Sequence, residues 1–270
     1  MTKFLESTKG MPRRQLLRQW IVRAGALAGA AALAGCDKLG ANPAFRDLLK
    51  TGETINLKIH QAIAPRSAMA QEFTTADLSP TFRGNGNTNP IDAPYVDFVK
   101  NAFTTWTLTI DGLVELPTQY SLAQLRGLPA RTQITRHDCV EGWSAIGQWT
   151  GVPLLTLLEK AKPRPDAKYV VFHCADSFAG RGNSPRVPYY ESIDMEDANH
   201  AQTILAYALN GKSLPVANGA PLRLRVERQL GYKQAKYITR IELVASLEKL
   251  GNGGGGYWED RSGYPWYAGI

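Results

Sequence analysis

Residues 135–144 of the chain read TRHDCVEGWS, and residues 149–154 read WTGVPL. Cys139 lies in the middle of the first stretch, among neighbours that are too polar for routine packing in a core. Most free cysteines are buried and inert, but Arg136 is close enough along the chain to favour a thiolate here. A thiolate at this position would act as a nucleophile, a redox centre or a ligand for a soft metal. Cys139 is therefore the candidate catalytic residue.

A second pair of motifs lies further along the chain. Residues 218–223 read NGAPLR, and residues 231–238 read GYKQAKYI. Arg223 and Lys236 supply cationic donors, and the glycines leave backbone N–H groups accessible, which is the combination that binds a phosphate group. Arg223 alone would be interpreted as a solvated arginine on a strand.

These motifs resemble the sulfite oxidase family of molybdopterin enzymes, and the pattern is closest to the catalytic subunits of periplasmic methionine-sulfoxide reductases. The resemblance covers about residues 80–245. It implies an α+β, mainly-β molybdopterin-binding fold and a molybdenum–molybdopterin cofactor. It also implies that the Cys139 thiolate binds molybdenum directly, beside the dithiolene of a single pterin. The implied reaction is the transfer of one oxygen atom to or from a sulfoxide, sulfite or another small sulfur compound.

The resemblance also assigns the contacts to the cofactor. The expected cofactor-binding residues are Asn85, Asn87, Cys139, Cys174, Asn218, Arg223, Gln234, Ala235 and Lys236. Cys174 departs from the pattern, because the reductases have a threonine at this place and a thiol is a weaker hydrogen-bond donor than a hydroxyl. Cys174 is either a second sulfur near the metal or a buried residue of a strand, and we favour the second interpretation.

Five further polar residues are candidates for roles around the centre. They are Arg136, His137, His173, Arg181 and Arg186. The two histidines flank the expected centre and would orient its ligands through hydrogen bonds, although satisfied histidines of a core are equally common. Arg181 and Arg186 share one loop and would steer an anionic substrate, whereas solvated loop charges are the more frequent outcome.

The formal charge of +7 is concentrated at the start of the chain. Residues 1–35 contain six lysines and arginines and a single glutamate, so the remainder is nearly neutral and gives no support for a nucleic-acid partner. The adjacent Arg13 and Arg14 precede a weakly apolar stretch, residues 20–35, that is too short for a stable membrane span. This arrangement resembles a twin-arginine export signal, which delivers proteins that have already folded.

The end of this stretch, residues 33–36, reads LAGC and resembles the cleavage box of bacterial lipoproteins. Cys36 would then become the lipidated N-terminus and hold the protein on the periplasmic side of the inner membrane, where Asp37 favours retention. The alternative is an ordinary cleavage site, which would leave a soluble periplasmic protein.

Four segments follow from these patterns. They are an export signal over residues 1–35, an irregular arm over 36–103, the molybdopterin-binding oxidoreductase domain over 104–250, and a flexible Gly/aromatic tail over 251–270.

Within the domain, the hydrophobic pattern and the turn residues predict individual elements. Strands are expected over residues 106–110, 169–174, 222–226 and 237–244. Asp111-Gly112 is expected to form a hairpin turn into a further strand over 113–116. Helices are expected after the capping box at Ser121, over 154–161, and over 200–209 before Asn210-Gly211.

The cysteine spacing bears on the source of electrons. The chain has no CxxCH haem motif and no cysteine cluster for an iron–sulfur centre. We therefore expect an external electron partner, either a membrane cytochrome or a quinone-linked subunit. Only 34 residues follow Lys236, too few for the dimerisation domain of eukaryotic sulfite oxidases, so a monomer is expected.

Two other classes of function remain open at this point. One is a cofactor-free lipoprotein that uses a degenerate version of the domain to bind a partner or ligand. The other is a thiol redox protein in which Cys139 and Cys174 form a disulfide.

Overall fold

A computed structural model describes residues 42–45, 48, 49, 51, 52, 55, 58, 59, 65–180, 182 and 184–270. The expected export signal with Cys36, and also Arg181, lie outside these residues. The chain divides into two units, residues 1–65 and 66–270. The described part of the first unit is mainly helical. No described helix is long and apolar enough to cross a membrane.

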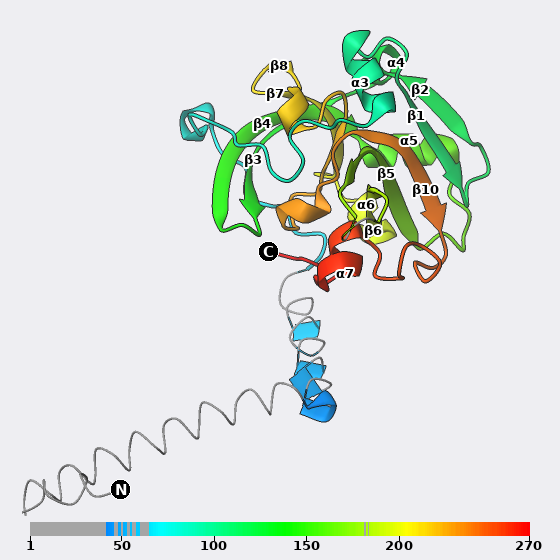
Figure 1. The fold of residues 1–270 in the computed structure, drawn as a ribbon. Helices are drawn as coiled ribbons and strands as arrows, with labels where there is room; N and C mark the ends of the chain where they lie inside the picture. The colour runs from blue at the N-terminus through cyan, green and yellow to red at the C-terminus, as the bar shows by residue number, and fades with distance from the viewer. Residues whose placement is uncertain are drawn as a thin grey trace, which may run out of the picture. The chain divides into compact units, whose positions relative to one another are not determined.

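The second unit is built on two five-stranded sheets (Figure 1). The first has the order β2-β1-β10-β5-β6, with β1 (Thr107–Gly112), β2 (Thr118–Ser121), β5 (Tyr169–Phe178), β6 (Val187–Asp194) and β10 (Ile238–Val244). β1 and β10 run parallel, and the other neighbours are antiparallel. Leu108, Ile110, Phe172 and Ile241 from these strands are fully buried in the main hydrophobic core.

The second sheet carries the cysteine motif. Its strands are β3 (Arg131–Cys139), β4 (Trp143–Pro153), β7 (Ile204–Leu209), β8 (Lys212–Ser213) and β9 (Arg223–Arg225), with β9 paired to β7. β3 and β4 pair without interruption from Arg131 opposite Gly151 to Cys139 opposite Trp143. Figure 1 shows them as a long curved hairpin. Cys139 therefore lies at the tip of the hairpin, where the pairing ends.

Short helices and 3-10 turns connect the strands. The helices are α3 (Ala93–Lys100), α4 (Leu122–Arg126), α5 (Leu154–Ala161), α6 (Met195–Ala198) and α7 (Tyr257–Ser262), and the 3-10 turns are η2 (Thr75–Asp77), η3 (Val216–Asn218) and η4 (Gly231–Lys233). The Ser121 capping box is present at the start of α4, and α5 has the predicted bounds. The predicted mainly-β α+β class and these two helices are confirmed, as are strands at β5, β9 and β10.

The predicted hairpin turn at Asp111-Gly112 is wrong. Both residues belong to β1, because they pair in parallel with Glu242 and Leu243 of β10. Gly112 has a φ of +82°, and an added Cβ would lie 2.4 Å from the Leu243 carbonyl oxygen. The antiparallel partner of β1 is β2, which starts later than predicted.

The predicted helix over residues 200–209 is also wrong, since Ile204–Leu209 form strand β7. β7 lies between β4 and β9, and these pairings outweigh the helical propensity of its alanines and leucines. Asn210 and Gly211 both have positive φ, 51° and 73°. They form the turn of the β7–β8 hairpin, for which an Asn-Gly pair is the strongest short signal.

The C-terminal segment is more ordered than a flexible tail. It contains α7 and buries Tyr257, Glu259 and Ala268. The sequence pattern suggested flexibility because residues 251–256 read GNGGGG. Several of these glycines instead pack closely, and an added Cβ on Gly256 would lie 2.2 Å from a carboxylate oxygen of Glu259.

Candidate active site

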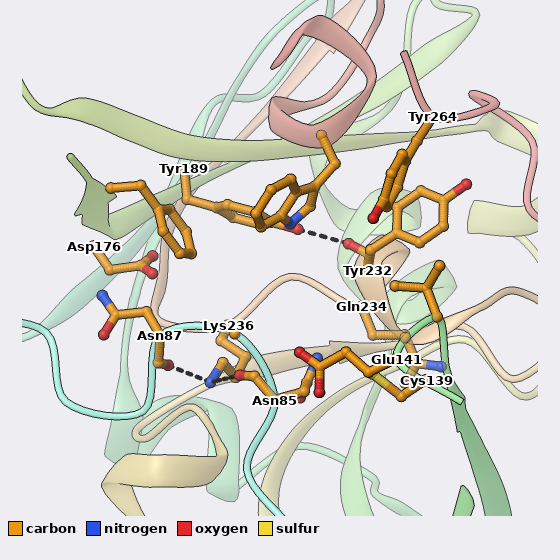
Figure 2. Close-up of a pocket in the computed structure, with 15 residues that line it drawn as sticks. Asn85, Asn87, Cys139, Glu141, Asp176, Tyr189, Tyr232, Gln234, Lys236 and Tyr264 are labelled. Atoms are coloured by element: carbon orange, nitrogen blue, oxygen red, sulfur yellow. Dashed lines mark hydrogen bonds between the residues drawn. The ribbon is translucent and has the colours of Figure 1, made fainter. Parts of the chain in front are cut away.

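A cleft in the second unit collects five of the nine predicted cofactor-binding residues, together with several residues that were not predicted. Its volume is about 650 Å³, including the part that opens to solvent. Besides the hairpin tip with Cys139, two surfaces line it. The polar floor comprises Asn85, Asn87, Asp176, Gln234 and Lys236, and the aromatic wall comprises Phe178, Tyr189, Tyr232, Trp258 and Tyr264. Figure 2 shows the floor and the wall facing each other across the cleft, with Cys139 at one end.

The β3–β4 hairpin fixes the thiol at its tip. Cys139 is opposite Trp143 in the last pair of the ladder. Gly142 closes the turn with a φ of +86°, which glycine adopts without strain, and its N–H donates to the Cys139 carbonyl oxygen at 3.0 Å. Cys139 is thereby held at the end of the cleft with only 8% of its surface exposed.

The surroundings of Cys139 oppose ionisation of the free thiol. Burial raises the pKa of the Cys139 thiol, and the Glu141 carboxylate raises it through its charge and a hydrogen bond. The Glu141 backbone N–H and the Arg83 guanidinium act in the opposite direction, but the net pKa is raised. The thiol therefore remains protonated at neutral pH unless a ligand such as a metal ion displaces the proton.

Arg83, which the sequence reasoning missed, takes the role predicted for Arg136. Its guanidinium lies 5.3 Å from the centre of the Trp143 ring. Arg136 is on the opposite face of β3 from Cys139, because side chains alternate along a strand, and it pairs with Asp138 at 3.0 Å. Arg83 had no sequence signal, since its approach to Cys139 depends on the fold.

Lys236 is the cation of the polar floor. Its Nζ donates to the backbone carbonyl oxygens of Asn85 at 2.7 Å, Asn87 at 2.5 Å and Ala217 at 3.1 Å. Lys236 thereby joins the loop of residues 85–87 to the turn that precedes the NGAPLR motif. Burial and the nearby charge of Arg223 lower the pKa of Lys236 to about 7.

Two side chains of the floor have polar atoms without a hydrogen-bond partner among the described residues. These are the buried Oδ1 of Asn85 and Oδ1 of Asp176, while the Gln234 side chain forms a hydrogen bond with His137. Burial is also the main reason that the pKa of Asp176 is raised to about 6. Buried polar atoms in native proteins are nearly always paired, so these atoms point to a polar ligand in the cleft.

Arg223 and Asn218 lie behind the floor and do not line the cleft. Arg223 is fully buried and donates to the carbonyl oxygens of Asn218 at 3.0 Å and Gln234 at 3.4 Å. Within the described chain it forms no ion pair with a carboxylate, and its Nε has no partner. Burial, followed by the charge of Arg225, lowers the pKa of Arg223 to about 9. Arg223 is thus a buried positive charge beneath the floor, and not the solvated arginine expected of an isolated strand residue.

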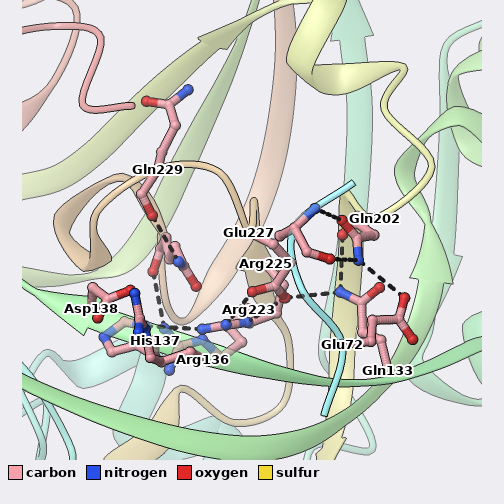
Figure 3. A network of polar contacts seen from close by, with 12 residues as sticks. Glu72, Gln133, Arg136, His137, Asp138, Gln202, Arg223, Arg225, Glu227 and Gln229 are labelled. Carbon is pink, nitrogen blue, oxygen red and sulfur yellow. Dashed lines mark hydrogen bonds and ion pairs between the residues drawn. The ribbon is translucent and has the colours of Figure 1, made fainter. Parts of the chain in front are cut away.

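His137 belongs to a buried polar network with Arg225, Glu227 and Gln133 (Figure 3). Arg225 Nη1 donates to His137 Nδ1 at 2.9 Å, and Arg225 also pairs with Glu227. Because burial and the two arginines lower its pKa, and because arginine only donates, His137 is the neutral tautomer with its proton on Nε2. Nε2 lies under Gly231, where an added Cβ would be 2.5 Å away. His137 therefore supports the cleft wall from behind.

Several other predicted residues lie outside the cleft lining. His173 is 2.8 Å from Glu242 in a partly exposed charge cluster, and Arg186 bonds Ser177 at 2.8 Å. Ala235 is buried in the core. Cys174 is a strand residue packed against that core, and burial raises the pKa of its thiol well above the usual value. Cys139 and Cys174 are both free thiols.

The aromatic wall was also missed by the sequence reasoning. Phe178 and Tyr189 come from β5 and β6, Tyr232 from η4, and Trp258 and Tyr264 from the C-terminal segment. The aromatic content of the tail was visible in the sequence. Its position beside the cysteine motif was not, because it depends on contacts between distant parts of the chain.

A family model described as the oxidoreductase molybdopterin binding domain matches residues 95–249. The chain belongs to this family. The match includes both sheets and the Cys139 hairpin, and it ends before the C-terminal segment that completes the aromatic wall.

Curated relatives give more specific similarities. The putative protein-methionine-sulfoxide reductase subunit YedZ1 of Azospira oryzae is 44% identical over 61% of this chain and 56% of its own length. The protein-methionine-sulfoxide reductase catalytic subunit MsrP of Xanthomonas axonopodis is 40% identical over 53% of this chain and 46% of its own length. MsrP of Ralstonia nicotianae is 39% identical over 52% of this chain and 44% of its own length. The chain thus spans about half the length of the curated relatives it matches. Among solved structures, the sulfane dehydrogenase SoxCD of Paracoccus pantotrophus matches with a TM-score of 0.46 and 25% identity, over 53% of this chain and 39% of that one.

The cofactor of this family is molybdenum bound to molybdopterin, and the cleft fits it in three respects. A soft thiol, Cys139, is available at one end to ligate the metal. Lys236 lines the floor and Arg223 lies beneath it, and within the described residues neither forms an ion pair, as a phosphate site requires. The unpartnered oxygens of the floor match the polar edge of a pterin.

The electrostatic role of Glu141 can be measured directly. We expect Glu141→Gln to lower the pKa of Cys139, because the substitution removes a carboxylate charge that raises this pKa. The measurement is the pH dependence of thiol alkylation in cofactor-free protein that carries Cys36→Ala and Cys174→Ala. Asp138→Asn, on the same hairpin, is the matched control and should leave the profile unchanged. An unchanged profile in Glu141→Gln would show that the carboxylate does not act on the thiol.

Proposed function

We propose that the protein is an exported molybdopterin-dependent reductase that removes the oxygen atom from sulfoxides, with methionine sulfoxide as the substrate class. The observation that carries the proposal is the placement of a buried thiol and a buried lysine without an ion pair in the lining of one cleft, above the buried Arg223. The names of the relatives support the same reaction. Reduction of a sulfoxide consumes two electrons and two protons and releases a thioether and water.

When bound, the cofactor supplies two-electron oxygen-atom transfer. Cys139 holds the metal, and its thiol proton must leave first. The Glu141 carboxylate accepts a hydrogen bond from this thiol, so it is placed to take the proton, while Arg83 and the Glu141 N–H stabilise the thiolate. Lys236, through its charge, and the backbone around Gln234 would hold the phosphate end, and Arg223 holds that backbone in place.

The charges of the cleft favour a neutral substrate. Among the described lining residues Lys236 is the sole cation, and it is engaged with three carbonyl oxygens, whereas Glu141 and Asp176 are carboxylates. A sulfite dianion would meet two acidic groups, and the charge of the one lysine in the lining is assigned to the cofactor phosphate. A sulfoxide carries no net charge and avoids this repulsion.

The proposal includes the location and the electron source. Export through the twin-arginine route suits a protein that must bind its cofactor before crossing the membrane, and lipidation at Cys36 would hold it on the periplasmic side of the inner membrane. Electrons would come from a membrane cytochrome or a quinone-linked subunit. A lipid anchor would raise the effective concentration of either partner.

The central test is metal content together with turnover. We expect the wild-type protein to contain about one molybdenum per chain and to reduce methionine sulfoxide and dimethyl sulfoxide with an artificial electron donor. Cys139→Ala should abolish turnover, because the metal loses its protein ligand. Cys174→Ala is the matched control and should keep more than about half of the activity.

The alternatives give different outcomes in this experiment. Wild-type protein without molybdenum, produced in cells that make the cofactor, would contradict the proposal and favour a cofactor-free binding module. Turnover without molybdenum that depends on both cysteines would favour a thiol redox protein. A fully active Cys139→Ala would refute the ligand assignment.

Cofactor retention should depend on pH through Lys236. Its pKa is lowered to about 7 in the cofactor-free protein, and an anionic phosphate beside it favours the ammonium form. Above pH 7, Lys236 must therefore take up a proton when the cofactor binds. This proton uptake weakens the affinity for the cofactor by up to about tenfold for each pH unit above 7. Below pH 7 Lys236 is already charged and contributes no further change.

The measurement is the molybdenum retained after dialysis over a range of pH. In Lys236→Arg the side chain stays charged at every pH used. Its molybdenum retention should therefore not show the decline that begins near pH 7 in the wild type. The titration of Asp176 affects the pH profile of both proteins in the same way, so it cancels in the comparison. Identical pH profiles for the two proteins would show that Lys236 does not sense the phosphate.

A further inference from the structure

The C-terminal segment, residues 256–270, completes the cleft from outside the part of the chain that matches the family. The family match ends at residue 249, yet Trp258 and Tyr264 line the same cleft as Cys139. Figure 2 shows Tyr264 on the side of the cleft opposite Lys236 and Asn85. This part of the wall is therefore supplied by a segment that the family domain does not include.

Buried charges anchor the segment. Lys233 forms ion pairs with Glu191 of β6 and, at 2.6 Å, with Glu259 of α7. All three side chains are almost completely buried. Removing Lys233 would leave two buried carboxylates without a cation and would be strongly destabilising. The ion cluster therefore fixes α7 against the sheet.

Hydrogen bonds anchor the rest of the segment. Tyr232 Oη donates to the Pro265 carbonyl oxygen at 2.7 Å, and Trp266 Nε1 donates to Ser192 Oγ at 2.9 Å. The Leu230 N–H donates to the Ala268 carbonyl oxygen at 2.9 Å. Anchors before and after Tyr264 hold this part of the wall in a single arrangement.

The aromatic side chains form a continuous surface. The rings of Trp258 and Tyr264 stack with centroids 5.9 Å apart and an interplanar angle of 23°. Tyr264 meets Tyr232 edge-on at 5.0 Å, and Trp258 meets Phe178 edge-on at 5.6 Å. Trp258 and Tyr264 are each partly exposed, so a ligand can reach them.

We propose that Trp258 and Tyr264 are specificity-determining residues that bind the apolar arm of a neutral sulfoxide. Methyl and thioether groups pack favourably on aromatic rings, and the rings exclude water from that side of the cleft. The inference rests on the proposed reductase function and adds the residues that select the substrate. An anionic substrate such as sulfite gains nothing from these rings, whose faces are electronegative.

The test uses holoenzyme variants Trp258→Ala and Tyr264→Ala, with Trp258→Phe as the conservative variant. Tyr267→Ala is the control, because Tyr267 belongs to the same segment but lies outside the cleft lining, against Arg66. Molybdenum content, KM and kcat for methionine sulfoxide, and calorimetric affinity for the thioether product are measured for each protein.

We expect both alanine variants to raise KM and weaken thioether binding by about tenfold. Molybdenum content should be unchanged and kcat should stay within about twofold. Trp258→Phe should restore most of the affinity, and Tyr267→Ala should match the wild type.

Other outcomes overturn the inference. Unchanged KM and thioether affinity in both alanine variants would show that the wall does not bind substrate, and loss of molybdenum in Trp258→Phe would show that it belongs to the cofactor site. Wild-type protein that holds molybdenum but neither reduces nor binds a sulfoxide would contradict the proposed function itself, and the inference with it.

Discussion

The structure depends on positive charge that is buried without a protein counterion. Arg223 is fully buried and Lys236 nearly so, and in the described chain neither pairs with a carboxylate. Burial of an unpaired charge costs several kcal/mol, and it lowers the pKa of both side chains. Backbone carbonyl oxygens offset part of this cost by holding Lys236 between two loops and Arg223 beneath Gln234. An anionic cofactor phosphate would supply the missing counterion, so the energetics of the fold and of the site are linked.

At the cysteine end of the cleft, the surroundings disfavour a charged side chain. Burial and Glu141 keep the Cys139 thiol neutral in the absence of a ligand, which protects it from adventitious chemistry. The β3–β4 hairpin places this thiol at a fixed end of the cleft. The C-terminal segment contributes aromatic rings to the wall that faces the polar floor. One cleft thus combines a soft ligand, an anion site and an apolar wall, each contributed by a different part of the chain.

The sequence predicted the elements whose formation depends on residues that are close together along the chain. A helix starts at the Ser121 capping box as predicted, and the helix over residues 154–161 has the predicted bounds. Five of the predicted residues line one cleft, namely Asn85, Asn87, Cys139, Gln234 and Lys236. The errors arose where tertiary pairing decides. Asn210-Gly211 is a hairpin turn because β4 and β9 flank Ile204–Leu209. Arg83 and the aromatic wall reach Cys139 only through the fold, and no spacing along the chain encodes that approach.

X-ray absorption at the molybdenum edge tests the central claim most directly, since it counts the sulfur atoms bound to the metal. The comparison is between purified wild-type holoenzyme and Cys139→Ser holoenzyme prepared in the same way. Cys139 ligation predicts one more sulfur ligand in the wild type than in the variant. The same number of sulfur ligands in both proteins would contradict the account.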